Sequence, residues 1–370
     1  LASARARSAV RVTATGLVLV FGAGLIGERA QAGEPPRLEI GGQTMLRLTS
    51  RLRDMDRPSA EIYNVRLLGS AFSDPYSFRM ELRFRQTKLR SYSPSNVWLQ
   101  QAYGRWRTPV EGLSVSAGLL YDQLGLFWDG AWFGNLPYLN GHKLDPDMNL
   151  ELALDRSAGS GLGWRAWLQA SPGEDGLNGS FTTSAKAARL RLGTPDLEVS
   201  SDYREALALR ARVVPGWSGA DWSFQPGVSA QRSVYDRRES SGLSAATGHQ
   251  TVVGAECTLR WHELELFGEI LHEEIVDLDP QTLDRDYLLG GVQLPLFEGR
   301  EGVVRDLRVG TSLQRTDYGA EDFDEWFVTA RVAARLDDLV GLTAEYVRWQ
   351  LSDRDVPELD RIELILHVYY

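Results

Sequence analysis

The sequence is poor in the residues that cross-link small exported proteins and bind transition metals. Its 370 residues include one cysteine and five histidines. The single cysteine, Cys257, excludes an intrachain disulfide, so the fold must be held by its own hydrogen bonds and buried surface. The histidines are dispersed along the chain without the spacing of a zinc site. They are His142, His249, His262, His272 and His367.

A calcium site is not supported either. Residues 145–149 copy the first half of a calcium-binding loop, with Asp145, Asp147 and Asn149 at alternate positions. However, Leu150 stands where the sharp turn needs glycine, and no glutamate follows at the twelfth position. We therefore expect neither a metal nor a cofactor.

Long apolar runs and an excess of basic residues are also missing. After residue 32 no run approaches the roughly 18 to 20 apolar residues that a membrane helix needs. The formal charge is -10, which argues against nucleic acid as a partner because phosphate binding needs a basic face. The slightly polar mean hydropathy of -0.26 fits a transmembrane barrel, whose strands contribute apolar residues only at every second position.

Residues 1–32 have the pattern of a cleavable export signal. Arg5, Arg7 and Arg11 precede an apolar stretch over 12–26, and the small residues of 30–32 follow as a cleavage site. The sequence thus predicts a signal peptide over 1–32 and one exported domain over 33–370. Residues 1–32 carry four arginines and one glutamate, so the formal charge becomes -13 without them.

The same stretch contains a G-x-G-x-x-G motif over 22–27, preceded by the apolar run 17–21. A dinucleotide site would need a helix and a second parallel strand after this motif. Only a short polar stretch follows before Pro35 and Pro36, and nothing downstream alternates strand with helix. We therefore favour the export signal over the cofactor site.

Apolar and polar residues alternate along much of the remaining chain, which is the period of a β-strand. The clearest case is 361–370, with apolar residues at its even positions: Ile362, Leu364, Leu366, Val368 and Tyr370. Residues 78–85 show the same period, with charged residues at the odd positions: Arg79, Glu81, Arg83 and Arg85. A soluble sheet shows such alternation too, so the direction of the apolar face has to come from other features.

The connections between these segments alternate between short and long. Short ones are expected at 73–75, 109–112, 193–196, 262–263 and 337–338, and long ones at 86–96, 122–147, 171–180, 234–248, 275–285 and 351–360. This is typical of a membrane barrel with short periplasmic turns and long external loops. At about 20 residues per strand and connection, residues 33–370 predict an all-β, transmembrane, antiparallel up-and-down β-barrel of about 16 strands. Eighteen strands stay open, because 197–214 reads as one long strand or as two short ones.

One hairpin resembles a known family. Residues 99–106 and 112–119 resemble the "QAY…W…GL…AG" hairpin of the bacterial outer-membrane porin superfamily, most like the phosphate-selective O/P-type porins. The resemblance implies a homotrimer of sixteen-stranded barrels, each with a long third loop folded into the lumen, here 122–147. It also implies that the terminal aromatic Tyr370 is a signal for the barrel assembly machinery. The three lysines of the chain, Lys88, Lys143 and Lys186, are scattered, and an 18-stranded alginate-export barrel has a similar hairpin style.

If the apolar faces turn to lipid, the charged positions line a pore. The predicted lining set is rich in arginine in the first half of the chain and in glutamate in the second. It consists of Arg47, Arg79, Arg83, Arg85, Arg105, Arg107, Arg165, Arg189, Arg191, Arg210, Arg212, Glu265, Glu269 and Glu345. Opposite charges on opposite walls would set up a transverse field, and rings of arginine favour anions. The alternative is that the charges only solvate the lumen.

Residues 122–147 combine aromatic and acidic side chains that could narrow the pore. The predicted constriction residues are Asp122, Phe127, Trp128, Asp129, Trp132, Phe133 and Tyr138. The alternative is that the rings pack against the barrel wall and only fix the loop.

The function predicted from these features is an outer-membrane porin for passive diffusion of small hydrophilic solutes, with an anion preference, and not an enzyme. Its partners are outer-membrane lipid, the solutes and the barrel assembly machinery. The alternatives are a sugar or polysaccharide-export channel, an outer-membrane enzyme and a structural barrel. No G-x-S-x-G or comparable nucleophile motif supports an enzyme.

Overall fold

The structure is a computed structural model of the whole chain. Among the residues that it describes, no helix is long and apolar enough to cross a membrane. The described residues are 37–51, 58–86, 96–126, 146–156, 161–172, 203–238, 244–276, 283–298, 304–319, 323–351 and 359–370. The predicted export signal, Arg189, Arg191 and the expected turn at 193–196 lie outside these ranges.

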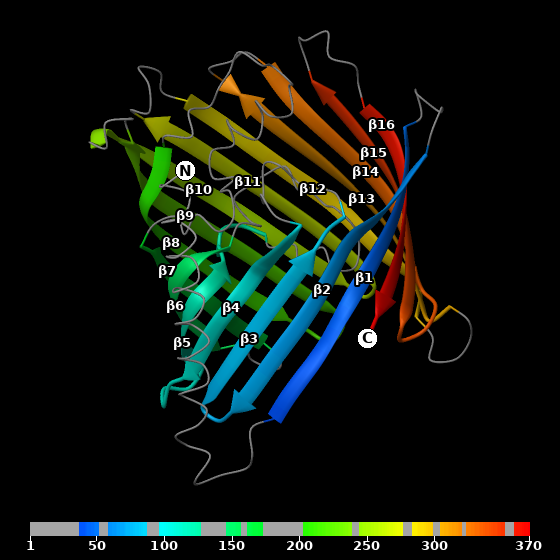
Figure 1. The fold of residues 1–370 in the computed structure, drawn as a ribbon, viewed down its shortest axis with the longest axis horizontal. Coiled ribbons are helices and arrows are strands. Elements are labelled where there is room, and N and C mark those ends of the chain that lie inside the picture. Colours follow the sequence, from blue (N-terminus) through cyan, green and yellow to red (C-terminus); the bar gives the residue numbers. More distant parts are fainter. Residues whose placement is uncertain are drawn as a thin grey trace, which may run out of the picture.

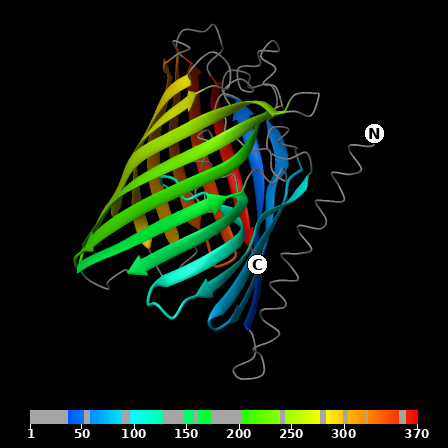
Figure 2. The same ribbon diagram turned by 90° about the vertical axis from the view of Figure 1, so that its left-hand side faces the viewer.

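These residues form a closed antiparallel barrel of 16 strands in which each strand pairs with its neighbours in sequence and β1 pairs with β16 (Figure 1). The strands are β1 Arg37–Arg51, β2 Ser59–Ser73, β3 Tyr76–Phe84, β4 Val97–Arg107, β5 Leu113–Tyr121, β6 Pro146–Arg156, β7 Gly161–Ser171, β8 Tyr203–Ser218, β9 Trp222–Arg238, β10 Ser244–Trp261, β11 Leu264–Val276, β12 Leu283–Glu298, β13 Asp306–Tyr318, β14 Phe323–Arg335, β15 Val340–Leu351 and β16 Leu359–Tyr369. The predicted count of 16 is confirmed, and the alternative of 18 is wrong. In Figure 2 the cyan and green strands run obliquely across the wall, as the tilt of a closed barrel requires.

Alternation places apolar side chains outside and polar ones inside. In β16, Ile362 and Leu364 are 40% exposed on the outer face, whereas Glu363, Ile365 and His367 are buried on the inner face. The other strands repeat this pattern, so the outer surface is a continuous apolar belt, as a lipid-facing barrel requires. Large aromatic side chains collect on the outer face near one rim, and they are Trp106, Trp164, Trp217, Trp222, Trp261, Phe297 and Tyr370.

The two ends of the barrel differ in their connections. At the turn end, β2 and β3 are joined by 74–75, and β10 and β11 by 262–263. At the opposite, loop end, β5 and β6 are joined by 122–145 and β7 and β8 by 172–202. The connection at 122–145 follows the fifth strand, as predicted.

The structure corrects one sequence prediction and resolves a second that was left open. The expected long loop at 234–248 is wrong, because β9 extends to Arg238 and β10 begins at Ser244. The polar residues that suggested a loop extend this hairpin instead. Residues 203–214 belong to the single strand β8, and β7 pairs directly with β8, so the barrel wall closes without residues 173–202.

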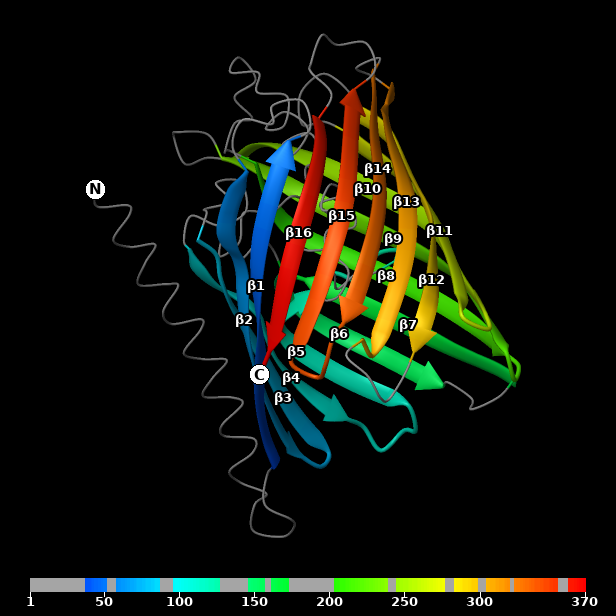
Figure 3. The same cartoon turned by 90° about the vertical axis from the view of Figure 1, so that its right-hand side faces the viewer.

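Strands β1 and β16 lie side by side and close the barrel (Figure 3). Their seam has a glycine, Gly42, opposite Tyr370. The backbone N–H of Gly42 donates to the carbonyl oxygen of Tyr370 at 2.7 Å, and the N–H of Tyr370 donates to the carbonyl of Gly42 at 3.1 Å. A Cβ at position 42 would lie 2.4 Å from the ring of Tyr370 and 2.6 Å from the carbonyl oxygen of Arg66. Only glycine therefore lets the Tyr370 ring lie against this point of the wall.

Candidate functional site in the barrel interior

The predicted lining residues within the described ranges lie at inward-facing positions of their strands. They come from seven strands: Arg47 from β1; Arg79 and Arg83 from β3, with Arg85 directly after it; Arg105 and Arg107 from β4; Arg165 from β7; Arg210 and Arg212 from β8; Glu265 and Glu269 from β11; and Glu345 from β15. Two of them lie close to the turn-end rim. Arg107 forms an exposed ion pair with Asp74, and Glu265 pairs with Arg260.

Several arginines of the first half are paired with carboxylates instead of facing the lumen as isolated charges. Glu81 bridges Arg66 and Arg83, with nitrogen–oxygen distances of 2.8 Å and 2.5 Å. Arg47 contacts both Glu61 and Glu363. Carboxylates of β2 and β3 thus stand beside the arginines on the same wall, so the simple division into a basic and an acidic half is modified by local pairing.

Pairing continues around the barrel. Arg105 lies 3.7 Å from Glu151 of β6, and the Nε of Arg212 donates to Glu256 of β10 at 2.8 Å. Glu256 and Glu151 were not among the predicted lining residues. The alternation within β6 and β10 could have identified them, because Glu151 lies between the exposed Leu150 and Leu152, and Glu256 lies between the exposed Ala255 and Cys257.

The wall formed by β1 to β4 combines arginines with aromatic rings. The guanidinium carbon of Arg47 lies 4.0 Å from the ring centroid of Tyr63, and that of Arg85 lies 4.6 Å from the same ring. Arg85 also lies 5.8 Å from the Trp98 ring. The Nη2 of Arg83 donates to the hydroxyl of Tyr121 at 2.8 Å. Guanidinium groups over aromatic faces are held by cation–π attraction.

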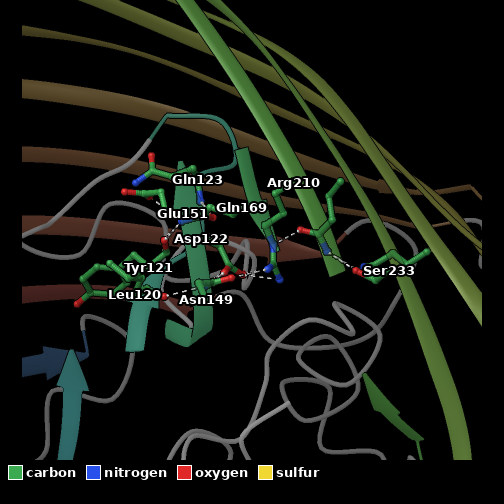
Figure 4. Close-up of polar contacts among 11 residues, drawn as sticks. Leu120, Tyr121, Asp122, Gln123, Asn149, Glu151, Gln169, Arg210 and Ser233 are labelled. Atoms are coloured by element: carbon green, nitrogen blue, oxygen red, sulfur yellow. Dashed lines mark hydrogen bonds and ion pairs between the residues drawn. The ribbon is translucent and has the colours of Figure 1, made fainter. Parts of the chain in front are cut away.

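The first residues after β5 lie inside the barrel. Asp122 and Arg210 form an ion pair at 2.9 Å in which both side chains are almost fully buried. The side-chain amide of Asn149 donates to Asp122 at 3.3 Å and to the Leu120 carbonyl at 3.2 Å. Figure 4 shows Asp122 and Asn149 directed toward the Arg210 guanidinium. This group fixes the point at which the chain leaves β5.

Gln169 of β7 holds the same turn from the other side. Its carbonyl oxygen accepts the backbone N–H of Gln123 at 2.9 Å, and its amide donates to the Tyr121 carbonyl at 3.0 Å and to Glu151 at 2.9 Å (Figure 4). The backbone at 121–123 is therefore fastened by β6, β7 and β8 together.

A polar network continues from Arg210 along the inner wall. The Nε of Arg210 donates to Gln231 at 2.9 Å, and Gln231 donates to Ser233 at 2.9 Å and to Gln250 at 3.3 Å. Gln250 donates to Glu273, which also accepts from the Tyr287 hydroxyl at 2.6 Å. The network therefore connects the base of the loop to strands β8 through β12.

Apolar contacts attach residues 124–126 to the inner face of β10–β12. Leu124 is buried against Val252, Leu271 and Tyr287, and Leu126 is buried against Phe267 and Leu289. The N–H of Gly125 donates to Ser229 at 3.1 Å and that of Leu126 to Glu269 at 3.2 Å. The chain thus passes from β5 to the inner face of β9–β12, and we call residues 122–126 the inner segment.

The apolar surface against which the inner segment packs was not predicted from the sequence. Inward positions of β10–β12 were expected to be polar, yet Val252, Leu271 and Leu289 are buried there. Neighbouring outward residues such as Ile270 and Leu288 are also apolar. A strand with apolar residues at both its odd and its even positions was the signal that could have indicated an apolar inner surface.

Of the predicted constriction residues, the described ranges contain only Asp122, which is buried at the base of the inner segment. The others lie outside the described residues: Phe127, Trp128, Asp129, Trp132, Phe133 and Tyr138. In the described part of the chain, no group of three or more His, Cys, Asp or Glu side chains is arranged to hold a metal ion.

The closed 16-stranded barrel and its charged interior define a porin-type fold. The chain matches no protein-family model, and no curated protein matches it in sequence. Solved structures do share the fold. The outer membrane channel DcaP of Acinetobacter baumannii is 11% identical with a TM-score of 0.59, covering 90% of this chain and 97% of that one.

Two further structures give the same result. The anion-selective porin from Comamonas acidovorans is 9% identical with a TM-score of 0.57, covering 90% of this chain and all of that one. The trimer form of OmpT, an outer membrane protein of Vibrio cholerae, is 12% identical with a TM-score of 0.56, covering 91% of this chain and all of that one. These similarities show that the chain has the fold of bacterial outer-membrane porins.

Proposed function

We propose that the protein is a channel of the bacterial outer membrane through which small hydrophilic solutes diffuse passively. The observation that supports this most is the combination of a closed barrel with an apolar outer belt and a charged inner face. A water-filled lumen is the environment that suits such an inner face, because unsolvated charges are costly to bury. No covalent chemistry and no cofactor enter this function.

The location and assembly belong to the same proposal. Residues 1–32 act as the cleaved export signal, and Tyr370 is read by the barrel assembly machinery. The aromatic side chains near the turn-end rim suit the periplasmic interface, where such rings gather. A homotrimer is supported by the fold shared with the trimer form of OmpT.

We propose a modest preference for anions. Among the described residues, Arg79 of β3 and Arg85 directly after it form no ion pair with a carboxylate, while most other inner-face arginines of β1–β8 do. The unpaired positive charges therefore add to the potential along this wall, and fixed positive charge favours anions. The anion-selective porin that shares the fold is consistent with this direction. Phosphate selectivity is not proposed, because the scattered lysines give no cluster.

We further propose that residues 127–145 set the narrowest point of the lumen. The inner segment directs the chain into the barrel just before them, and the anchoring of 122–126 to β8–β12 fixes where they start. Deletion of 128–140 tests this, since it spares the contacts of the inner segment. We expect higher single-channel conductance, and unchanged conductance would refute the constriction.

Planar-bilayer recording of the purified protein tests the channel itself. We expect discrete conductance steps, with a reversal potential in a potassium chloride gradient that indicates a mild chloride preference. Absence of conductance from a correctly folded barrel would favour a structural barrel instead. A strong cation preference would keep the channel but overturn the role of the arginine wall.

A further inference from the structure

Arg85 is enclosed between two aromatic rings at the end of β3. Its guanidinium carbon lies 4.6 Å from the ring centroid of Tyr63 and 5.8 Å from that of Trp98. The residue retains only 7% of its surface exposed. Both rings are fixed, since Tyr63 is buried with Met45 and Ile365, and the Trp98 indole N–H donates to Gln100 at 2.6 Å.

This cation has no negative partner in the described part of the chain. The Nε atom of Arg85 is buried and has no hydrogen-bond partner. The neighbouring carboxylates are already engaged, since Glu81 is bound by Arg66 and Arg83 and Glu61 is bound by Arg47. Cation–π attraction offsets only part of the desolvation of a buried guanidinium. An anion from outside the chain would complete the site.

We propose that Arg85 anchors a binding subsite for a small organic monocarboxylate inside the barrel. A carboxylate matches the fork of a guanidinium and forms charge-assisted hydrogen bonds with it. The adjacent rings of Tyr63 and Trp98 provide apolar surface for the hydrocarbon part of such a molecule. Arg47, which also lies over the Tyr63 ring, is already paired with Glu61 and Glu363. Among the described residues the site therefore offers one cation without a carboxylate partner, and a monovalent anion matches it better than phosphate.

The subsite deepens the proposed function by naming a class of solute, and only its effect on transport rests on that function. Arg79 provides a matched control for the binding. It lies in β3 on the inner face, forms no ion pair or ring contact within the described residues, and is exposed. Replacing Arg79 therefore removes one wall charge without changing an enclosed guanidinium.

Planar-bilayer conductance measured against potassium acetate concentration tests the transport consequence. We expect conductance to saturate in the wild type, because a binding site limits flux. In Arg85→Gln the half-saturating concentration should rise about tenfold or more, the effect expected when a charge-assisted hydrogen bond is lost. Arg79→Gln removes a charge that adds to the wall potential but not to the site, so it should reduce the chloride preference while the half-saturating concentration stays within about twofold of the wild type. Equal effects of the two variants would overturn the subsite.

A second measurement does not depend on a conducting lumen. Saturation-transfer NMR with acetate alone, on the detergent-solubilised protein, reports binding even if the barrel is closed. We expect a signal in the wild type and in Arg79→Gln, a weaker one in Arg85→Lys, and its loss in Arg85→Gln. Acetate binding without conductance would refute the channel and support the subsite. Conductance without acetate binding would support the channel and refute the subsite. Tighter binding of inorganic phosphate than acetate would overturn the assignment to monocarboxylates.

Gel mobility before and after heating shows whether each variant folds. If Arg85→Gln does not fold, Arg85→Lys decides the matter, because it keeps the charge and loses the fork. A Lys variant that binds acetate as tightly as the wild type would contradict the proposed guanidinium recognition.

Discussion

The two walls of the barrel use their inward side chains differently. On β8–β12 the polar groups are joined into one network from Arg210 to Tyr287, and apolar residues beside it hold the inner segment. On β1–β4 most arginines share carboxylates or lie over rings, and Arg85 has no carboxylate partner among the described residues. One wall is therefore occupied by the protein's own chain, and the other presents charge to the interior.

The difference shows how buried polarity can serve structure or binding. A satisfied network rigidifies its surroundings, because each group would lose its partners if a neighbour moved. An unsatisfied cation is costly and is retained where a ligand can supply the missing charge. The comparison predicts that changes in the β8–β12 wall affect stability, whereas changes in the β1–β4 wall mainly affect solutes.

The largest expected effect comes from breaking the buried pair at the base of the inner segment. Arg210→Met leaves the Asp122 carboxylate buried without its cation, and we expect the free energy of unfolding to fall by about 4 kcal/mol. Denaturant unfolding in lipid vesicles, followed by tryptophan fluorescence, measures this change. Hydrogen exchange at 122–126 should accelerate in the same variant.

The double variant Asp122→Asn with Arg210→Met provides the control. Because it removes both charges, it should recover a large part of the lost free energy. If the double variant were as unstable as Arg210→Met alone, the pair would not be what stabilises the inner segment.

A smaller loss is expected from the apolar contact of the inner segment. Leu124→Ala leaves a cavity against Val252 and Leu271, and we expect a loss of about 3 kcal/mol, within the usual range for buried leucines. Ile270→Ala is the matched control, because Ile270 is 57% exposed on the outer face of β11. Equal losses in both variants would mean that the inner segment does not depend on this contact.

The smallest effect on stability is expected on the opposite wall. Tyr63→Leu removes the ring between Arg47 and Arg85 and should cost about 1 kcal/mol, the scale of a cation–π contact. Tyr63→Phe keeps the ring and should lower the free energy of unfolding less than Tyr63→Leu does. A loss in Tyr63→Leu as large as that in Arg210→Met would contradict the distinction between the two walls.

Much of the barrel could be predicted, because the alternation of inward and outward side chains depends only on neighbouring positions in each strand. The two-residue period of 361–370 assigned Ile362 and Leu364 to one face and Glu363 to the other, and the structure confirms both. The turns at 262–263 and 337–338 lie between strands, as expected from their polar residues. The strand count followed from the regular spacing of such segments.

The arrangement of the interior could not be predicted in the same way. Asp122 and Arg210 meet because the barrel closes, and their separation in sequence gives no sign of the contact. Glu81 pairs with Arg66 through the register of β2 and β3, whereas the alternation within each strand shows only that both face inward. The packing of Leu124 against Leu271 depends on the path of the chain through the lumen, and strand periodicity does not predict that path.

The seam at Gly42 and Tyr370 has a kinetic consequence. Gln43 and His367, which are hydrogen-bonded at 3.0 Å across it, lie 324 positions apart in the chain. Contacts between distant segments form slowly, because the entropy of closing a long loop must be overcome first. Until they form, β1 and β16 expose two rows of unpaired backbone groups that can pair with another chain. Closure of this seam therefore removes the last two open edges of the sheet, and with them the sites at which another chain could pair.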